Sequence, residues 1–365
     1  MKIFEFDHTH SKDIIEKGNR NRIIDKHLHK RLNDTKGLID NYDKYKWDKY
    51  KKHLNPYEYI YIQSNIHKNI CKVLPISRSY FKLHEILYDL NLLDNYKKVK
   101  ITCIAEGPGG FIQSLLNILK TRNIEIEKIY GITLLSEDND IPSWNPIIES
   151  NTNVDILNGI DNTGDICNPN NLLDFIKKIE KNTCDIITCD GGIDYSEDYN
   201  NQELSSYEFI YNEIVLSLHL QREGGSLIIK MFDISYYSSI QFIYILYQCY
   251  DTVRIIKPYT SRNTNSEKYI VCKGYRYNSR ILELLNEYYN KKKNLIIHIP
   301  KSFFENIKFY NQIFIENQIK SINDIIDKIN QNNIVFNKPT QNQIDKAIEW
   351  CKSYDLEIND KCAYL

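Results

Sequence analysis

Short apolar runs alternate with longer segments of helical spacing between about residues 76 and 275. The runs have the length and composition of buried strands, and they cover residues 100–104, 128–134, 153–157, 185–189, 226–232, 252–256 and 269–273. Most of the intervening segments place apolar residues three and four apart, as amphipathic helices do; these segments are 111–120, 171–179, 204–220 and 238–249. This alternation predicts an α/β protein whose mostly parallel, seven-stranded sheet carries helices on both faces.

The two flanking segments are more polar. Residues 1–75 are rich in basic and aromatic residues, above all from Lys44 to His53, and two short helices are expected there. Their side chains form either a solvated helix face or an RNA-contacting surface on which aromatic rings stack bases. Residues 276–365 predict helices alone, packed on the sheet or on a partner. The expected organisation is therefore a helical, basic and aromatic extension (1–75), a core domain (76–275) and a helical appendage (276–365).

Composition narrows the class of protein further. The chain has 365 residues and a formal net charge of −1, which argues against a uniformly basic nucleic-acid-binding surface. Its nine cysteines are scattered singly without a C-x-x-C pair, so reduced thiols are expected, and no disulfide framework or metal site. The sequence shows no signal-peptide pattern and no apolar run long enough to span a bilayer, so we expect a soluble, intracellular protein.

A glycine-rich turn from Glu106 to Phe111 separates the first apolar run from a helical segment. Glycine lets the backbone approach a ligand closely, and a helix N-terminus offers unpaired N–H groups to an anionic group. The spacing GPGG is not the G-x-G-x-x-G of dinucleotide sites, so a carboxylate-bearing adenosine ligand such as S-adenosylmethionine fits better. An ordinary strand-to-helix turn is the alternative. The candidate cofactor residues here are Glu106, Gly107, Pro108, Gly109, Gly110 and Phe111.

Three polar residues stand at ends of predicted strands, where ligands bind in open α/β sheets. Asp190 follows one strand, Lys230 ends another, and Glu267 precedes a third. A lysine at the end of an apolar strand is costly to bury without a partner. Lys230 is therefore either a functional group or half of a structural ion pair with Asp190.

The segment Ser77-Arg78-Ser79-Tyr80-Phe81-Lys82-Leu83 resembles the signature that precedes the cofactor loop in FtsJ-like ribose 2′-O-methyltransferases. This resemblance covers residues 76–275 and implies a Rossmann-like fold that binds S-adenosylmethionine. It also implies a catalytic tetrad composed of Lys82, Asp190, Lys230 and Glu267. In that tetrad Lys230 is the candidate general base, since the Lys82 cation favours its neutral form while Asp190 and Glu267 oppose this.

The same resemblance implies further cofactor contacts. Asp165 is expected to accept a hydrogen bond from the adenine amino group, and Asp190 to meet the amino group of the methionine end. The chain departs from the usual pattern at two positions, because Cys103 stands where many methyltransferases have an acid and Thr133 stands at the usual ribose-binding acid.

Residues 131–134 and 164–166 resemble the cap-specific members of the family from eukaryotes and large DNA viruses. That branch implies capped mRNA as substrate, methylated at the first transcribed nucleotide. It also implies a cytoplasmic site of action, with the C-terminal helices as a possible contact to the capping machinery. The loop of Trp144 and the N-terminal segment are candidates for stacking the cap. Methylation of ribosomal or transfer RNA, and an inactive RNA-binding subunit, are the alternatives.

Overall fold

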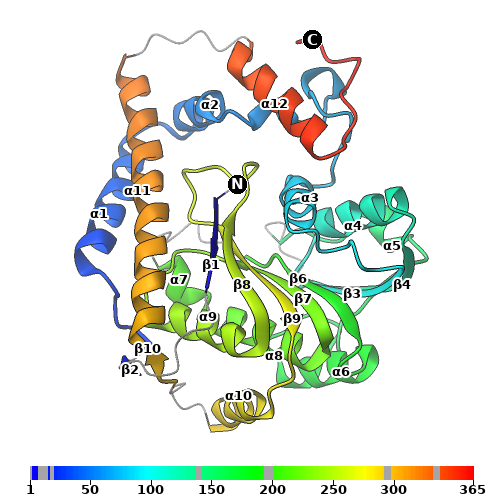
Figure 1. Cartoon of the computed structure of the whole chain (residues 1–365). Coiled ribbons are helices and arrows are strands. Elements are labelled where there is room, and N and C mark those ends of the chain that lie inside the picture. Colours follow the sequence, from blue (N-terminus) through cyan, green and yellow to red (C-terminus); the bar gives the residue numbers. More distant parts are fainter. Residues whose placement is uncertain are drawn as a thin grey trace.

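An eight-stranded sheet forms the centre of the computed structural model, which describes residues 2–6, 15–16, 20–135, 141–192, 201–291, 297–331 and 338–365 (Figure 1). The strand order is β1-β8-β9-β7-β6-β3-β4-β5. The strands are β1 (Lys2–Glu5), β3 (Lys98–Ile104), β4 (Glu125–Ile132), β5 (Val154–Ile156), β6 (Cys184–Cys189), β7 (Gln221–Met231), β8 (Tyr250–Lys257) and β9 (Lys268–Tyr275). Strands β7, β6, β3, β4 and β5 pair in parallel, and β9 is antiparallel to both its neighbours. All seven predicted strands and the mostly parallel arrangement are confirmed.

Alternate residues of the central strands point to opposite faces and enter different cores. On β7, Leu227 and Ile229 join one cluster and Ile228 joins the other. The first cluster includes helices α6 (Pro169–Ile179), α8 (Tyr207–Leu220), α9 (Tyr237–Cys249) and α10 (Ser279–Lys291). The second includes α3 (Ser79–Asp89), α4 (Gly110–Thr121) and α5 (Pro146–Glu149). The predicted layers of helices on both faces are thus present.

The N-terminal segment contributes a strand that the sequence pattern did not predict. Strand β1 pairs antiparallel with β8 and becomes the eighth strand at the sheet edge. A short strand with exposed polar residues such as Lys2 and Glu5 has too little apolar periodicity to be recognised. The two predicted helices are present as α1 (Lys26–Gly37) and α2 (Lys44–Leu54). Shorter elements are α7 (Gln202–Ser205), β2 (Ile15–Glu16), β10 (Ile299–Pro300) and the 3₁₀ turns η1 (Leu38–Asn41), η2 (Glu58–Ile60) and η3 (Ile66–Lys68).

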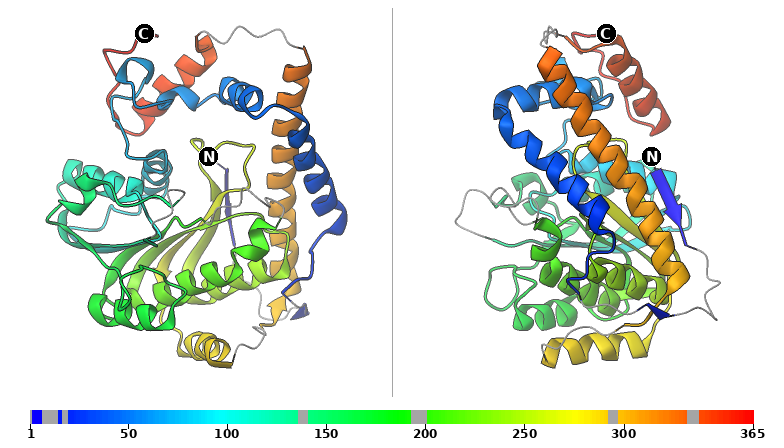
Figure 2. Two further views of the ribbon diagram at one scale, coloured as in Figure 1. Left: turned by 180° about the vertical axis from the view of Figure 1, so that it is seen from behind. Right: turned by 90° about the vertical axis from the view of Figure 1, so that its left-hand side faces the viewer.

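Helix α11 (Lys301–Gln331) joins the two terminal segments. It runs beside α1 in both views of Figure 2, with Leu28 and Leu32 of α1 packed on Ile315 and Ile319 of α11. Further along α11, Trp47 and Tyr50 of α2 pack against isoleucines. Both aromatic side chains are buried, so neither expectation holds for them: they do not lie on a solvated helix face, and they are not available to stack bases.

The last helix, α12 (Gln341–Ser353), packs on α3 and on residues 57–73. The backbone of Cys71 also forms a β-bridge with Ile358, close to the C-terminus. The helices expected in residues 276–365 are therefore present as α10, α11 and α12, and they pack on the chain itself. The segment is not helical throughout, because the short strand β10 pairs with β2. Among the helices of the described chain, none is long and apolar enough to cross a membrane.

Candidate active site

The turn between β3 and α4 depends on glycine, because other segments of the chain pack closely against it. Gly109 adopts a φ of +111°, a conformation that side chains rarely take. A Cβ at Gly109 would lie 2.6 Å from the side chain of Ile148, and one at Gly107 would lie 2.6 Å from the carbonyl oxygen of Pro142. Both positions therefore require glycine, and the predicted strand, glycine turn and helix are present.

Glu106 points back into this turn. One carboxyl oxygen, Oε1, accepts a hydrogen bond of 2.8 Å from the backbone N–H of Phe111 in the first turn of α4. The other, Oε2, is buried and has no hydrogen-bond partner within the described chain. Burial, followed by the nearby charge of Asp190, raises the pKa of Glu106 well above its usual value. A buried oxygen free to bond, beside a glycine cradle, fits a ligand with its own polar groups, such as the methionine end of S-adenosylmethionine.

Some of the backbone donors assigned to the cofactor are already used within the loop. The N–H of Gly107 donates to Thr133 Oγ1 at 3.1 Å, and the N–H of Gly109 donates to the carbonyl of Glu106 at 2.8 Å. The role predicted for the Gly107–Phe111 backbone stays a prediction. Thr133 supports the loop directly, a contact that sequence reasoning did not assign to it.

Thr133 and Asp165 lie on adjoining loops at the C-terminal ends of β4 and β5. Gly164 approaches Thr133 so closely that a Cβ there would lie 1.8 Å from the Thr133 carbonyl oxygen. Asp165 Oδ1 accepts from the N–H of Cys167 at 2.8 Å. Asn171 holds this loop, since its amide accepts from the N–H of Ile160 at 2.9 Å and donates to the Asp165 carbonyl at 3.1 Å. We therefore identify Asn171 as a positioning residue of this edge.

Trp144, a candidate for stacking the cap, is packed into the core instead. Its side chain is 5% exposed, and its ring lies against Gly131 of β4, where a Cβ would come within 3.0 Å of it. The indole ring covers the strand and is not available to stack on the cap. The prediction fails for Trp144 because the absent side chain at Gly131 leaves a space that the ring fills.

The four residues of the expected tetrad come together as two ion pairs. Lys82, on α3, places its Nζ 2.7 Å from Glu267 Oε2, just before β9. Lys230, on β7, places its Nζ 2.7 Å from the backbone oxygen of Asp190 and 3.3 Å from Asp190 Oδ1. All four side chains are between 11% and 16% exposed. Their proximity matches the expected grouping, and their catalytic role stays a prediction.

The charges of the two pairs act on one another. Burial alone would raise the pKa of Glu267, but the cations of Lys82 and Lys230 lower it to about 2. Burial alone would lower the pKa of Lys230, but Asp190, Glu267 and Glu213 raise it above its usual value. The influence that we expected from Lys82 on Lys230 is outweighed by the charges of these three carboxylates.

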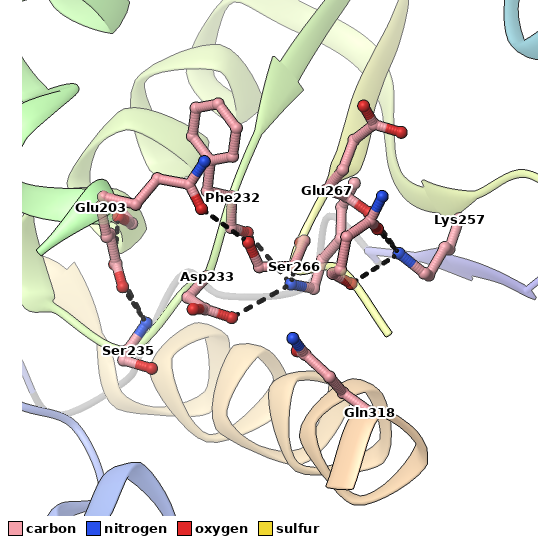
Figure 3. Close-up of polar contacts among 12 residues, drawn as sticks. Glu203, Phe232, Asp233, Ser235, Lys257, Ser266, Glu267 and Gln318 are labelled. Carbon is pink, nitrogen blue, oxygen red and sulfur yellow. Dashed lines mark hydrogen bonds and ion pairs between the residues drawn. The ribbon is translucent and has the colours of Figure 1, made fainter. Parts of the chain in front are cut away.

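Three further residues contact the tetrad and were missed in the sequence. The hydroxyl of Tyr269 donates to Asp190 Oδ1 at 2.8 Å, and that of Ser261 donates to Glu267 Oε1 at 2.9 Å. Lys257 donates to the backbone oxygen of Glu267 at 2.7 Å (Figure 3). Burial, together with nearby cations, lowers the pKa of Lys257 to about 7. One signal was available, because Lys257 ends an apolar strand just as Lys230 does.

Known proteins have sequences similar to that of this chain. Residues 75–275 match the family model described as FtsJ-like methyltransferase. Cap-specific mRNA (nucleoside-2′-O-)-methyltransferase 2 of Pongo abelii is 28% identical over 349 residues, which span 89% of this chain and 43% of that protein. Cap-specific mRNA (nucleoside-2′-O-)-methyltransferase 1 of Caenorhabditis elegans is 31% identical over 204 residues, or 52% of this chain and 22% of that protein. An inactive cap-specific mRNA (nucleoside-2′-O-)-methyltransferase 1B of Caenorhabditis briggsae is 31% identical over 52% of this chain and 23% of its own length. The chain thus spans less than half the length of these relatives.

Proposed function

The chain belongs to the FtsJ-like methyltransferase family, and from this premise we propose that it methylates a ribose 2′-oxygen of capped mRNA, with S-adenosylmethionine as methyl donor. The target is the first transcribed nucleotide, so that cap-0 becomes cap-1. Relatives named as cap-specific mRNA 2′-O-methyltransferases support the choice of substrate. The single observation that carries the reaction type is the meeting of Lys82, Asp190, Lys230 and Glu267 in two nearly buried ion pairs.

S-adenosylmethionine supplies a methyl group on a positively charged sulfur, so the electrophile arrives activated. The protein has two remaining tasks, which are to align the 2′-oxygen with that methyl group and to remove the hydroxyl proton. Lys230 takes the proton in this proposal. Only a neutral Lys230 can accept the proton. Asp190 and Glu267 raise the pKa of Lys230, and the positively charged sulfur of S-adenosylmethionine, bound near Lys230, would lower that pKa again. The ion pair of Lys82 with Glu267 orients the hydroxyl.

The cofactor would lie along the C-terminal ends of β3, β4 and β6. The Gly107–Phe111 turn with Glu106, and Asp190, hold its methionine end. Thr133 lies at the ribose, and Asp165 accepts from the adenine amino group. These assignments rest on the loop geometry and on the buried, unpartnered Oε2 of Glu106.

An inactive, RNA-binding role is the main competitor, and similarity alone does not separate the two, since an inactive relative is as similar as an active one. The tetrad favours activity. A site without catalysis gains nothing from holding two lysines and two carboxylates almost buried, because such pairs lose most of their Coulomb gain to desolvation.

The test is methyl transfer from labelled S-adenosylmethionine to short RNAs that differ only at the 5′ end. The set is uncapped, capped, capped with N7-methylguanine, and capped with the first 2′-oxygen already methylated. Transfer to the capped RNAs that disappears with the last substrate supports the proposal. Transfer that persists on the last substrate moves the target to a later nucleotide. Equal transfer to uncapped RNA points to ribosomal or transfer RNA, and no transfer with the cofactor bound favours the binding role.

A further inference from the structure

The loop between β8 and β9, residues 258–267, carries Glu267 into the tetrad and is contacted by elements from both ends of the chain. We propose that the terminal segments position this loop, and through it Glu267, for methyl transfer. The terminal segments would then fix the position of Glu267 relative to Lys82, in addition to any contact that they make with RNA. The proposal rests on the proposed function for its kinetic consequences, while its structural part stands on contacts within the chain.

The first contact joins the loop to the C-terminal helix α12 through Glu85 on α3. The fully buried carboxylate of Glu85 accepts from the backbone N–H of Tyr259 and, at 3.2 Å, from that of Thr260. The same carboxylate accepts from the indole N–H of Trp350 at 3.2 Å, across 265 residues of sequence. A buried carboxylate is stable only when its oxygens are bonded. The loop and α12 therefore satisfy one group together, and a change in either alters the other.

The second contact comes from the N-terminal segment. Glu58, in η2, is fully buried and receives a bidentate pair from Arg262 of the loop, at 2.6 Å from Nη2 and 3.0 Å from Nε. Arg78, which immediately precedes α3, lies 3.7 Å from the same carboxylate. Burial would raise the pKa of Glu58, but Arg262 and then Arg78 keep it below its usual value. A forked arginine pair with a buried carboxylate fixes both distance and orientation.

The third contact comes from α11. Gln318, which is 4% exposed, donates through Nε2 to the backbone oxygen of Thr264 at 3.0 Å. Figure 3 shows Gln318 on α11 close to the start of β9, where Lys257 meets Glu267. This hydrogen bond lies three residues before the catalytic carboxylate, in the last part of the loop.

The start of β9 is held from its other side by Lys268, the neighbour of Glu267. Lys268 is 2% exposed and donates to the backbone oxygens of Ser266 at 2.8 Å and Phe232 at 3.0 Å. Its Nζ also lies 4.0 Å from Asp233, which pairs at 2.6 Å with Lys36 of α1. The N-terminal helix α1 is thereby linked to the first residue of the strand that follows Glu267.

These contacts constrain the short distance between Lys82 and Glu267. Lys82 is fixed on α3, whereas the position of Glu267 depends on the loop. A displacement of about 1 Å in a positioning group can lower a rate by on the order of 100-fold. If a terminal segment served only to bind RNA, a substitution in it would raise the KM for RNA and leave kcat unaltered.

Two variants remove one hydrogen bond each, and Trp350→Phe also makes a buried side chain smaller. Trp350→Phe retains an aromatic ring against Phe81 and Tyr354 but loses the donor to Glu85. Gln318→Leu loses the donor to Thr264. We expect kcat to fall about 3- to 10-fold in each variant, the worth of one hydrogen bond, with the KM for capped RNA and the affinity for S-adenosylhomocysteine unchanged. The control is Arg31→Ala, which breaks an exposed α1–α11 pair with Glu316 and leaves the loop untouched.

Hydrogen exchange of the 258–267 peptide provides a readout that needs no activity. Faster exchange in both variants, but not in Arg31→Ala, supports the positioning role even if the wild-type protein transfers no methyl group, in which case only the proposed function fails. Wild-type exchange together with wild-type kcat in both variants overturns the inference. So does a raised KM for RNA at unchanged kcat.

Discussion

Substitutions of Lys230 can distinguish its role as a general base from the electrostatic effect of its positive charge. Lys230→Met would remove a cation 3.3 Å from Asp190 Oδ1. At an effective dielectric constant of about 20, the lost attraction is about 5 kcal/mol before desolvation is counted. Breaking a buried pair in this way costs about 3–5 kcal/mol of stability, which would confound any kinetic result. A variant that keeps the charge is therefore the better perturbation.

Lys230→Arg keeps a cation beside Asp190 but cannot release a proton near neutral pH. If Lys230 is the base, we expect kcat to fall by at least about 100-fold, within the usual contribution of general base catalysis of about 10²- to 10⁴-fold. That loss corresponds to about 3 kcal/mol or more in the activation barrier. Single-turnover transfer to capped RNA measures it, and calorimetry with S-adenosylhomocysteine checks that the cofactor site is intact.

The matched control is Lys100→Arg, the same change at another buried lysine. Lys100 lies near the N-terminal end of β3, away from the candidate active site, and its Nζ donates to the Ile179 carbonyl. Its kcat should match that of the wild-type protein. A Lys230→Arg rate within about threefold of wild type, at unchanged cofactor affinity, would refute the base assignment and leave Lys230 only an electrostatic role.

Three further predictions follow from single residues. The pKa of Glu267 is lowered to about 2, so its ion pair contributes its full stability above pH 4.5 and loses it as the pH falls toward 2. The urea midpoint of unfolding should therefore fall more steeply with decreasing pH in the wild-type protein than in Glu267→Gln. Burial and the charge of Asp190 raise the pKa of Glu106 and so disfavour its charged form; Glu106→Gln, a neutral side chain of the same shape, should therefore bind S-adenosylhomocysteine within about threefold of wild type, whereas Glu106→Ala, which loses the bond to Phe111, should lower the free energy of unfolding by about 1 kcal/mol. Asn171→Ala should lower it by about 1–3 kcal/mol and weaken cofactor binding, as calorimetry would show, because several loop groups lose their partner.

The core sheet could be predicted because its strands are buried on both faces. Strands such as β6 then appear as nearly continuous apolar runs, which stand out against helical spacing. Strand β1 was missed because it is short and half-exposed, and its partner β8 lies about 250 residues away. The contact that makes it a strand is not encoded in its own pattern.

The candidate site could be predicted only where the chemistry depends on local position. Asp190, Lys230 and Glu267 stand next to strand ends, and strand ends converge in space. Trp144 lies in an irregular loop, and nothing in its neighbourhood indicated that Gly131 on β4 would leave room for its ring. The hydroxyl of Tyr269 likewise reaches Asp190 from within an apolar run that predicted only core packing.

The terminal segments show why amphipathic spacing is a limited guide. Spacing on α11 and α12 predicted that one face of each is buried, but it could not indicate what covers that face. The informative groups are instead the buried polar ones. Glu58 and Glu85 would be costly to bury alone, so their complete burial requires donors. Those donors come from the loop of residues 258–267 and from α12, more than 170 residues away in the sequence. Polar satisfaction, rather than apolar periodicity, therefore couples the ends of the chain to Glu267.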